Sequence, residues 1–170
     1  KSKEMTLMIV HIVSTFIVYW VFVGVTPVLY MNDLGVAVSQ FGFYQGGGAL
    51  VYALGCIISG PIINKYNKKI MLIYSYYLSI LGLVVFLLIT FLDIKSPLLI
   101  ALSFSFYSIG TIIPIMLIYP ICVNFKSHAK AKTSSMIGMM RLIFTAIGLQ
   151  MVGYFYNGSF YNIGIILSVS

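Results

Sequence analysis

Side chains that could do chemistry are few in this chain of 170 residues. Its three acids, Glu4, Asp33 and Asp93, are separated by long apolar stretches. The sequence holds no His-Glu-x-x-His, Cys-x-x-Cys or G-x-x-x-x-G-K-[ST] pattern, so it lacks these signs of a metal, redox or phosphate site. We therefore predict no carboxylate pair, no metal site and no cofactor, and a protein that is not an enzyme.

The remaining candidates are aromatic and polar side chains within the apolar stretches. Aromatic faces with a few hydrogen-bonding groups can line a cavity for an amphipathic small molecule. Candidates for such a substrate cavity are Tyr19, Trp20, Tyr44, Gln45, Tyr107, Arg141 and Gln150. Tyrosine and tryptophan also form belts at membrane interfaces, so an interfacial or packing role stays open for each aromatic. His11 could titrate near neutral pH, with a capped interfacial histidine as the alternative.

Arg141 is the only arginine of the chain. Spacings of three and four place it on one helix face with Ser134, Gly138, Thr145 and Gly148. An arginine at the centre of a membrane helix costs about 2.5 to 3.5 kcal/mol on insertion scales, so its side chain should avoid hydrocarbon. Two interpretations stay open: a role in a cavity or between helices, and a side chain that snorkels to the head groups.

The composition predicts an integral membrane protein. Hydrophobic residues make up 61% of the chain and charged residues 8%, and the mean hydropathy is +1.05, which leaves too little polar surface for a soluble domain. The net charge of +7 falls mainly in short segments between apolar runs. Lysines so placed set membrane topology, and we expect no nucleic-acid partner.

The apolar runs predict an all-α fold of membrane-spanning helices, since one crossing takes about 20 residues. The predicted spans are 6–30, 40–63, 70–92, 98–123, 134–156 and a truncated sixth at 162–170. The cut sixth run indicates a piece of a longer chain. Every lysine-rich segment falls on one face, predicted to be cytoplasmic.

Individual spans carry further expectations. The glycines of the second span predict a helix buried among others, because small residues let helix backbones approach closely. The third span is apolar nearly all round and suits a lipid-facing position. Pro114 and Pro120 predict a bent fourth helix whose freed carbonyls need partners. Cys56 and Cys122 are expected to stay unpaired, because both lie near the predicted cytoplasmic face.

The segment 60–69 between the second and third spans resembles the loop motif of the major facilitator superfamily, G-x-x-x-D-R-x-G-R-R. The matching residues are Gly60, Lys65, Lys68 and Lys69, while Asn64 replaces the acid and Asn67 the second glycine. A degraded copy is typical of the loop between helices eight and nine, so the resemblance implies the C-terminal six-helix half, built as three plus three helices. A generic positively charged loop is the alternative.

Residues 34–44 resemble the entry to the eighth helix of Bcr/CflA-type drug resistance transporters, with Leu-Gly followed by Ser-x-Phe-Gly. This resemblance implies secondary active transport by alternating access, with proton-coupled efflux of drugs or small amphipathic molecules. It also implies a bacterial inner membrane, and as partners protons, the lipid bilayer and the N-terminal half of the transporter. The alternatives are an uptake transporter of the same superfamily for a nutrient or osmolyte, and a non-transporting membrane scaffold subunit.

Overall fold

The computed structural model describes residues 2–125 and 129–155. Its elements are α1 Ser2–Val28, the π-helical turn η1 Leu29–Asp33, α2 Val38–Lys65, α3 Lys68–Phe91, α4 Pro97–Asn124 and α5 Lys130–Phe155. Among these residues no strand occurs, and five helices are long and apolar enough to cross a membrane. The all-α membrane architecture predicted from the sequence is confirmed.

The helices overlap the first five predicted spans, and the sixth, 162–170, lies outside the described residues. Helices α1 and α5 each begin four residues before the predicted span, α1 at Ser2 and not at residue 6, and α5 at Lys130 and not at residue 134. The extra turn of α5, Lys-Ala-Lys-Thr, is polar, so hydropathy alone does not count it as part of a span. This shift moves the middle of α5 close to Arg141.

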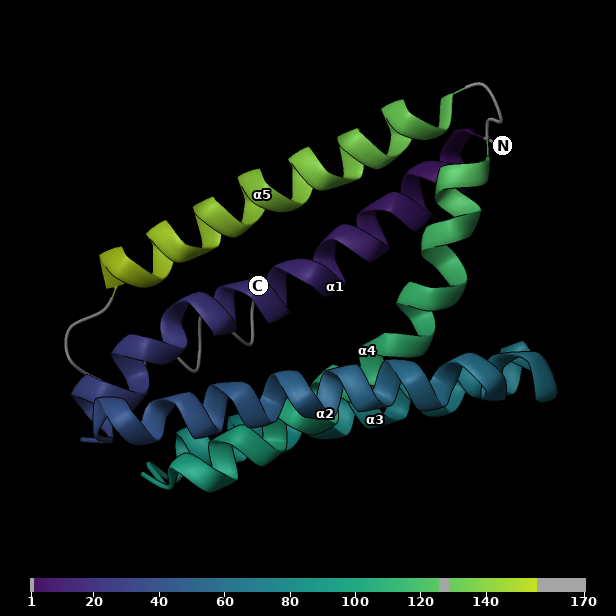
Figure 1. Ribbon diagram of the computed structural model, residues 1–170. Helices are drawn as coiled ribbons and strands as arrows, with labels where there is room; N and C mark the ends of the chain where they lie inside the picture. The colour runs from purple at the N-terminus through teal and green to yellow at the C-terminus, as the bar shows by residue number, and fades with distance from the viewer. Residues whose placement is uncertain (1, 126–128, 156–170) are drawn as a thin grey trace.

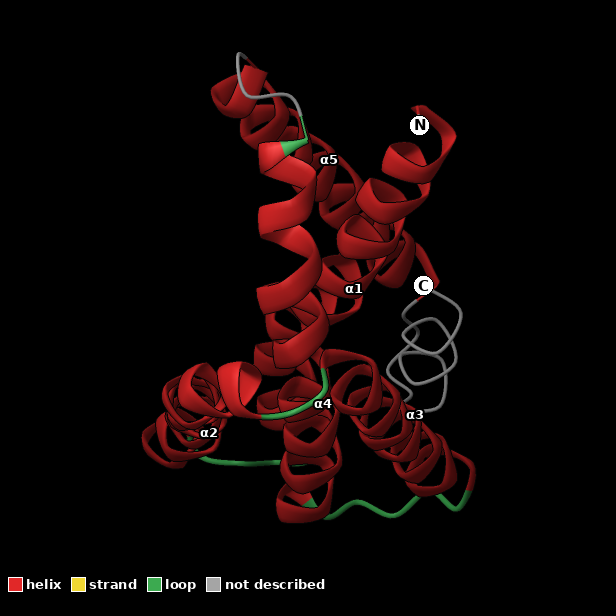
Figure 2. Cartoon of the chain, turned by 90° about the vertical axis from the view of Figure 1, so that its right-hand side faces the viewer, coloured by secondary structure: helices red, strands yellow, loops and turns green. Residues whose placement is uncertain are grey.

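Helix α4 occupies the centre of the arrangement. It lies between α2 and α3, with α1 packed above it, as the view along the helices shows (Figure 2). Helix α5 lies beside α1 and runs in the same direction (Figure 1). One region of the structure is therefore surrounded by α1, α2, α4 and α5. Helix α3 lies on the side of α4 opposite α2.

Helix α4 is bent, as its prolines predict. Its first half follows α3 and its second half turns away toward the N-terminal part of α1 (Figure 1). Pro114 has no N–H, so the carbonyl of Gly110 loses its helical donor. The buried Ser75 hydroxyl of α3 donates a hydrogen bond to that carbonyl. A side chain from the neighbouring helix thus satisfies the backbone group that the proline frees.

We call the closest helix contact the α3–α4 seam, formed by Ser75, Ser79, Gly82, Ser103, Tyr107 and Gly110. A Cβ built on Gly82 would lie 2.5 Å from the backbone nitrogen of Tyr107. One built on Gly110 would lie 2.5 Å from the backbone nitrogen of Ser79. The prediction of a lipid-facing α3 is wrong for the side of this helix that carries its small residues, because those residues pack directly on α4.

The glycines of α2 behave differently, and the prediction that this helix is buried among others is wrong for the described chain. A Cβ on Gly42, Gly46, Gly47, Gly48 or Gly60 would meet no atom within 4 Å. Only Gly55 is crowded, by the side chain of Ile112. Within residues 2–125 and 129–155, α4 supplies most of the contacts of α2, so the glycine-bearing face is left open.

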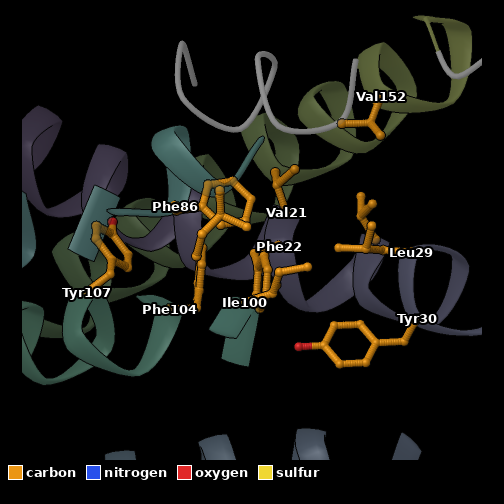
Figure 3. Packing of buried hydrophobic residues seen from close by; sticks show 11 residues of the cluster. Val21, Phe22, Leu29, Tyr30, Phe86, Ile100, Phe104, Tyr107 and Val152 are labelled. Atoms are coloured by element: carbon orange, nitrogen blue, oxygen red, sulfur yellow. The ribbon is translucent and has the colours of Figure 1, made fainter. Parts of the chain in front are cut away.

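Buried apolar residues form two clusters along α1. The larger joins α1, η1, α3, α4 and α5, and Figure 3 shows Phe22, Phe86 and Phe104 gathered within it. The rings of Phe22 and Phe104 stack with centroids 3.4 Å apart, which fixes α1 against α4. The smaller cluster is built from Ile9, Ile12, Val13, Cys122 and Ile137. Both cysteines are free thiols, as predicted.

Candidate functional site

A recess opens between α1, α2 and α4, with a volume of about 180 Å³. We call it the aromatic recess, and it is lined by Tyr19, Trp20, Phe22, Val23, Thr26, Tyr30, Tyr44, Gln45, Gly48, Ala49, Ala101, Phe104, Ser105 and Ser108. Aromatic rings and small residues predominate in this lining. Such walls suit a flat apolar group, with few polar contacts to orient it.

Gln45 supplies an unused polar group in this lining. Its Oε1 atom is buried and accepts no hydrogen bond from any described residue. The serine and threonine hydroxyls of the recess are satisfied within their own helices: Ser105 donates to the carbonyl of Ala101, and Thr26 to that of Phe22. The buried oxygen of Gln45 is therefore an unpartnered acceptor that a bound molecule with an N–H or O–H group could use.

A second recess, of about 190 Å³, adjoins the first. We call it the arginine recess, and it is lined by Thr15, Phe16, Tyr19, Trp20, Tyr52, Thr111, Ile115 and Arg141. Tyr19 and Trp20 belong to both linings, so these two side chains form the wall between the recesses. Their rings meet edge to face with centroids 5.8 Å apart.

Arg141 lies near the middle of α5, eleven residues after Lys130 and fourteen before Phe155. Its guanidinium carbon lies 5.5 Å from the ring centroid of Phe16 and 5.5 Å from that of Trp20, within the range of cation–π attraction. Phe16 is itself close to the middle of α1. The charged group is therefore held between two helices at mid-length, not extended toward a helix end.

The described residues gather no group of three or more His, Cys, Asp or Glu side chains that could hold a metal ion. Glu4 lies in the first turn of α1, Asp33 ends η1 and Asp93 follows α3. The site is therefore built from aromatic, amide, hydroxyl and guanidinium groups, which bind molecules by shape, hydrogen bonding and charge.

The amino-acid sequence of these helices matches a family model. A model described as Major Facilitator Superfamily matches residues 1–149. The chain belongs to the Major Facilitator Superfamily. Comparisons with curated proteins and with solved structures returned no match. The match is to the superfamily as a whole, and with the five apolar helices it shows an integral, multi-pass membrane protein of a transporter superfamily.

Most of the predicted cavity residues of this superfamily member lie at the two recesses. Tyr19, Trp20, Tyr44 and Gln45 line the aromatic recess, and Arg141 lines the arginine recess. Tyr107 and Gln150 line neither. Tyr107 is buried in the α3–α4 seam and donates a hydrogen bond to the backbone carbonyl of Thr15 at 3.1 Å. Gln150 is exposed on α5, which agrees with its spacing of nine residues from Arg141.

The loop motif lies at the junction of α2 and α3, apart from both recesses. Asn64, Lys65, Lys68 and Lys69 are exposed there, and Gly60 is half-buried. Asn67, which replaces the second glycine of the superfamily motif, caps α3: its side chain accepts a hydrogen bond from the backbone N–H of Lys69 at 2.9 Å. Asparagine is a favoured N-cap residue, so this departure from the motif has a structural reason.

Sequence reasoning missed Tyr52, whose ring lies 5.8 Å from that of Tyr19. The signal was available, because Tyr52 follows Gln45 by seven residues, which is two helical turns along one face of α2. It also missed Thr111, because a threonine that donates to the backbone of its own helix has no mark in sequence. The bond between His11 and Tyr76, at 2.9 Å, needs α1 and α3 to be placed in space and could not be predicted.

Proposed function

We propose that this chain forms part of a secondary active transporter and that the aromatic and arginine recesses are its contribution to the substrate site. The observation that carries this proposal is the pair of adjoining recesses between the helices, with the arginine recess at mid-length and the aromatic recess nearer the starts of α2 and α4. Their linings hold one unused amide oxygen and one guanidinium among aromatic, aliphatic and hydroxyl side chains. Polar groups at such depth are costly in a bilayer, and in transporters they mark substrate pathways.

The size of each recess fits this role. Complete sites for small molecules usually enclose about 300 to 1,000 Å³. The aromatic recess, of about 180 Å³, is smaller than that range. In a superfamily where substrates bind between two six-helix halves, we propose that an N-terminal half of the same transporter closes the site from the other side and that rocking of the halves gives alternating access.

The finer proposal is proton-coupled export of small amphipathic molecules, of the kind that Bcr/CflA-type transporters perform, across a bacterial inner membrane. Its support is the resemblance of residues 34–44 and the aromatic character of the lining. The acids of this chain lie at the ends of its helical segments, so we propose that the proton-carrying carboxylates belong to the other half.

Transport by the full-length protein tests this proposal. Inside-out vesicles would be loaded with an acidic interior, and accumulation of two fluorescent dyes, cationic ethidium and anionic carboxyfluorescein, would be followed. We expect accumulation of at least one dye, and its loss when a protonophore collapses the gradient. Accumulation that persists without the gradient would overturn proton coupling, and no accumulation of either dye would favour the scaffold alternative.

A further inference from the structure

We propose that the arginine recess binds an anionic group of the substrate, so that the transported molecules are amphipathic organic anions with a flat aromatic body. This inference rests on the proposed function and adds the chemical class of the substrate. The guanidinium of Arg141 would hold a carboxylate or sulfonate, and the aromatic recess would hold the ring system.

The charge of Arg141 is permanent, because a guanidinium is not deprotonated in proteins. Its guanidinium carbon lies over the rings of Phe16 and Trp20, and such cation–π contacts supply no acceptor to the guanidinium N–H groups. Within residues 2–125 and 129–155, no ion pair or hydrogen bond joins the Arg141 side chain to the protein. An oxyanion in the arginine recess would supply the missing acceptors.

The chain's own carboxylates are too distant to serve. At a rise of about 1.5 Å per residue, Glu4 lies about 18 Å along α1 from Phe16, and Asp33 about 20 Å from Trp20. Asp93 pairs with Lys95 in the loop after α3, at 3.6 Å. The sequence holds no other acidic side chain, so the residues outside the described ranges add none.

The lining also selects the sign of the charge. The two linings together hold one cation and no anion, and their other side chains are aromatic, aliphatic or uncharged polar. Because charges interact more strongly where water is excluded, a cationic amphiphile would be repelled from this lining and an anionic one attracted. Only the side chains of Tyr19 and Trp20 are shared by the two recesses, so the recesses are close together. A molecule that occupies both must therefore carry its anionic group on the ring system or within a short linker of it.

Binding of three matched naphthalene probes to the purified full-length protein tests this inference. The probes are 2-naphthoate, 2-naphthylmethanol and 2-naphthylmethylammonium, which share a ring and differ in charge. Binding would be read from the rise in thermal unfolding temperature with probe concentration, which needs no transport. We expect 2-naphthoate to bind the wild-type protein more tightly than either of the other probes.

Substitution of the arginine then tests its role. Arg141→Gln should weaken 2-naphthoate binding about 10- to 100-fold and 2-naphthylmethanol binding much less, because only the anion loses the attraction between opposite charges. Arg141→Lys should recover part of the loss, since it keeps the charge and loses the planar fork. Lys68→Gln is the matched control, because it removes one exposed positive charge from the α2–α3 junction.

The outcomes separate this inference from the proposed function. If the wild-type protein binds the cationic or neutral probe as tightly as 2-naphthoate or more tightly, the proposal of an anionic substrate is wrong. The proposed transport function would not be affected by that result. If the Arg141→Gln protein binds 2-naphthoate as tightly as wild type, the anion-binding role of Arg141 is likewise wrong, and the proposed transport function is again unaffected. If Arg141→Gln weakens all three probes alike, the arginine supports the shape of the site and does not bind the anionic group, and the inference is wrong. If no probe binds and no dye is transported, the proposed function falls with it.

Discussion

The α3–α4 seam and the two recesses are both rich in polar and small residues, but only the recesses contain polar side chains without a hydrogen-bond partner in the described chain. In the seam the side chains bond to backbone: Ser75 donates to Gly110 and Tyr107 to Thr15. In the recesses the serine and threonine hydroxyls also bond to backbone, but Gln45 leaves its oxygen unused and the guanidinium of Arg141 lies over two aromatic rings. The polar groups of the seam are thus satisfied within the protein, whereas Gln45 and Arg141 keep hydrogen-bonding capacity for a bound molecule.

Glycines show the same contrast. Those of the seam, Gly82 and Gly110, have the backbone of a neighbouring helix where a Cβ would be. Those of α2, such as Gly46, have open space within the described chain. Small residues in a membrane helix therefore mark close packing only when a partner helix is present. The comparison predicts that seam substitutions act on stability and recess substitutions on binding.

The largest effect is expected for Gly110→Ala. Its new methyl group would overlap the backbone of α3, which cannot move aside as a flexible side chain does. We expect a loss of about 3 kcal/mol in the free energy of unfolding, the upper end of the usual overpacking range. Thermal and denaturant unfolding of the purified full-length protein in detergent would measure it.

Gly46→Ala is the matched control for that substitution, because the same methyl group would meet no described atom. Its free energy of unfolding should change by less than about 1 kcal/mol, the size of the helix-propensity difference between glycine and alanine. A loss as large as that of Gly110→Ala would contradict the comparison between the seam and α2.

A smaller loss of stability is expected for Ser75→Ala, about 1 to 2 kcal/mol, because it leaves the buried carbonyl of Gly110 without a donor. The cause can be isolated by restoring the helical donor with Pro114→Ala. In that background Ser75→Ala should cost clearly less, and a double-mutant cycle would give the coupling. Equal losses in both backgrounds would show that the serine does not compensate for the proline.

Gln45→Leu should have the opposite profile. It removes a buried oxygen that has no described partner, so the free energy of unfolding should stay the same or rise. Binding of a transported dye should weaken about tenfold, equivalent to about 1.4 kcal/mol, through the loss of one hydrogen bond. Unfolding curves and dye titrations on the same preparation would measure both. Lower stability with unchanged dye binding would show that Gln45 stabilises the fold and does not bind the substrate.

Much of the fold could be predicted from the sequence, because long apolar runs and their lysine-bearing junctions are local features. Part of the candidate site could be predicted too, since groups such as Gln45 and Arg141 are rare inside apolar helices and cannot face lipid cheaply. Tyr107 shows the limit. A tyrosine has the same appearance in sequence whether its hydroxyl meets a distant backbone carbonyl or a cavity.

The glycines show the second limit. The strong pattern, Gly42 with Gly46 in α2, falls where the described chain leaves open space. The isolated Gly82 and Gly110 make the closest helix contact. Whether a glycine is needed depends on which surface faces it, and that surface comes from a helix elsewhere in the chain. No local pattern carries this information.

The central claim is that the adjoining recesses are the substrate site, and cysteine protection tests it most directly. Ser105→Cys would be introduced into the full-length protein with Cys56→Ala and Cys122→Ala, since Ser105 lines the aromatic recess. Alkylation by N-ethylmaleimide would be timed with and without a saturating concentration of a transported dye. Asn64→Cys, exposed at the end of α2, is the control that the dye should not affect. We predict that the dye slows alkylation of Ser105→Cys at least several-fold. An unchanged rate in protein that still transports the dye would contradict the claim.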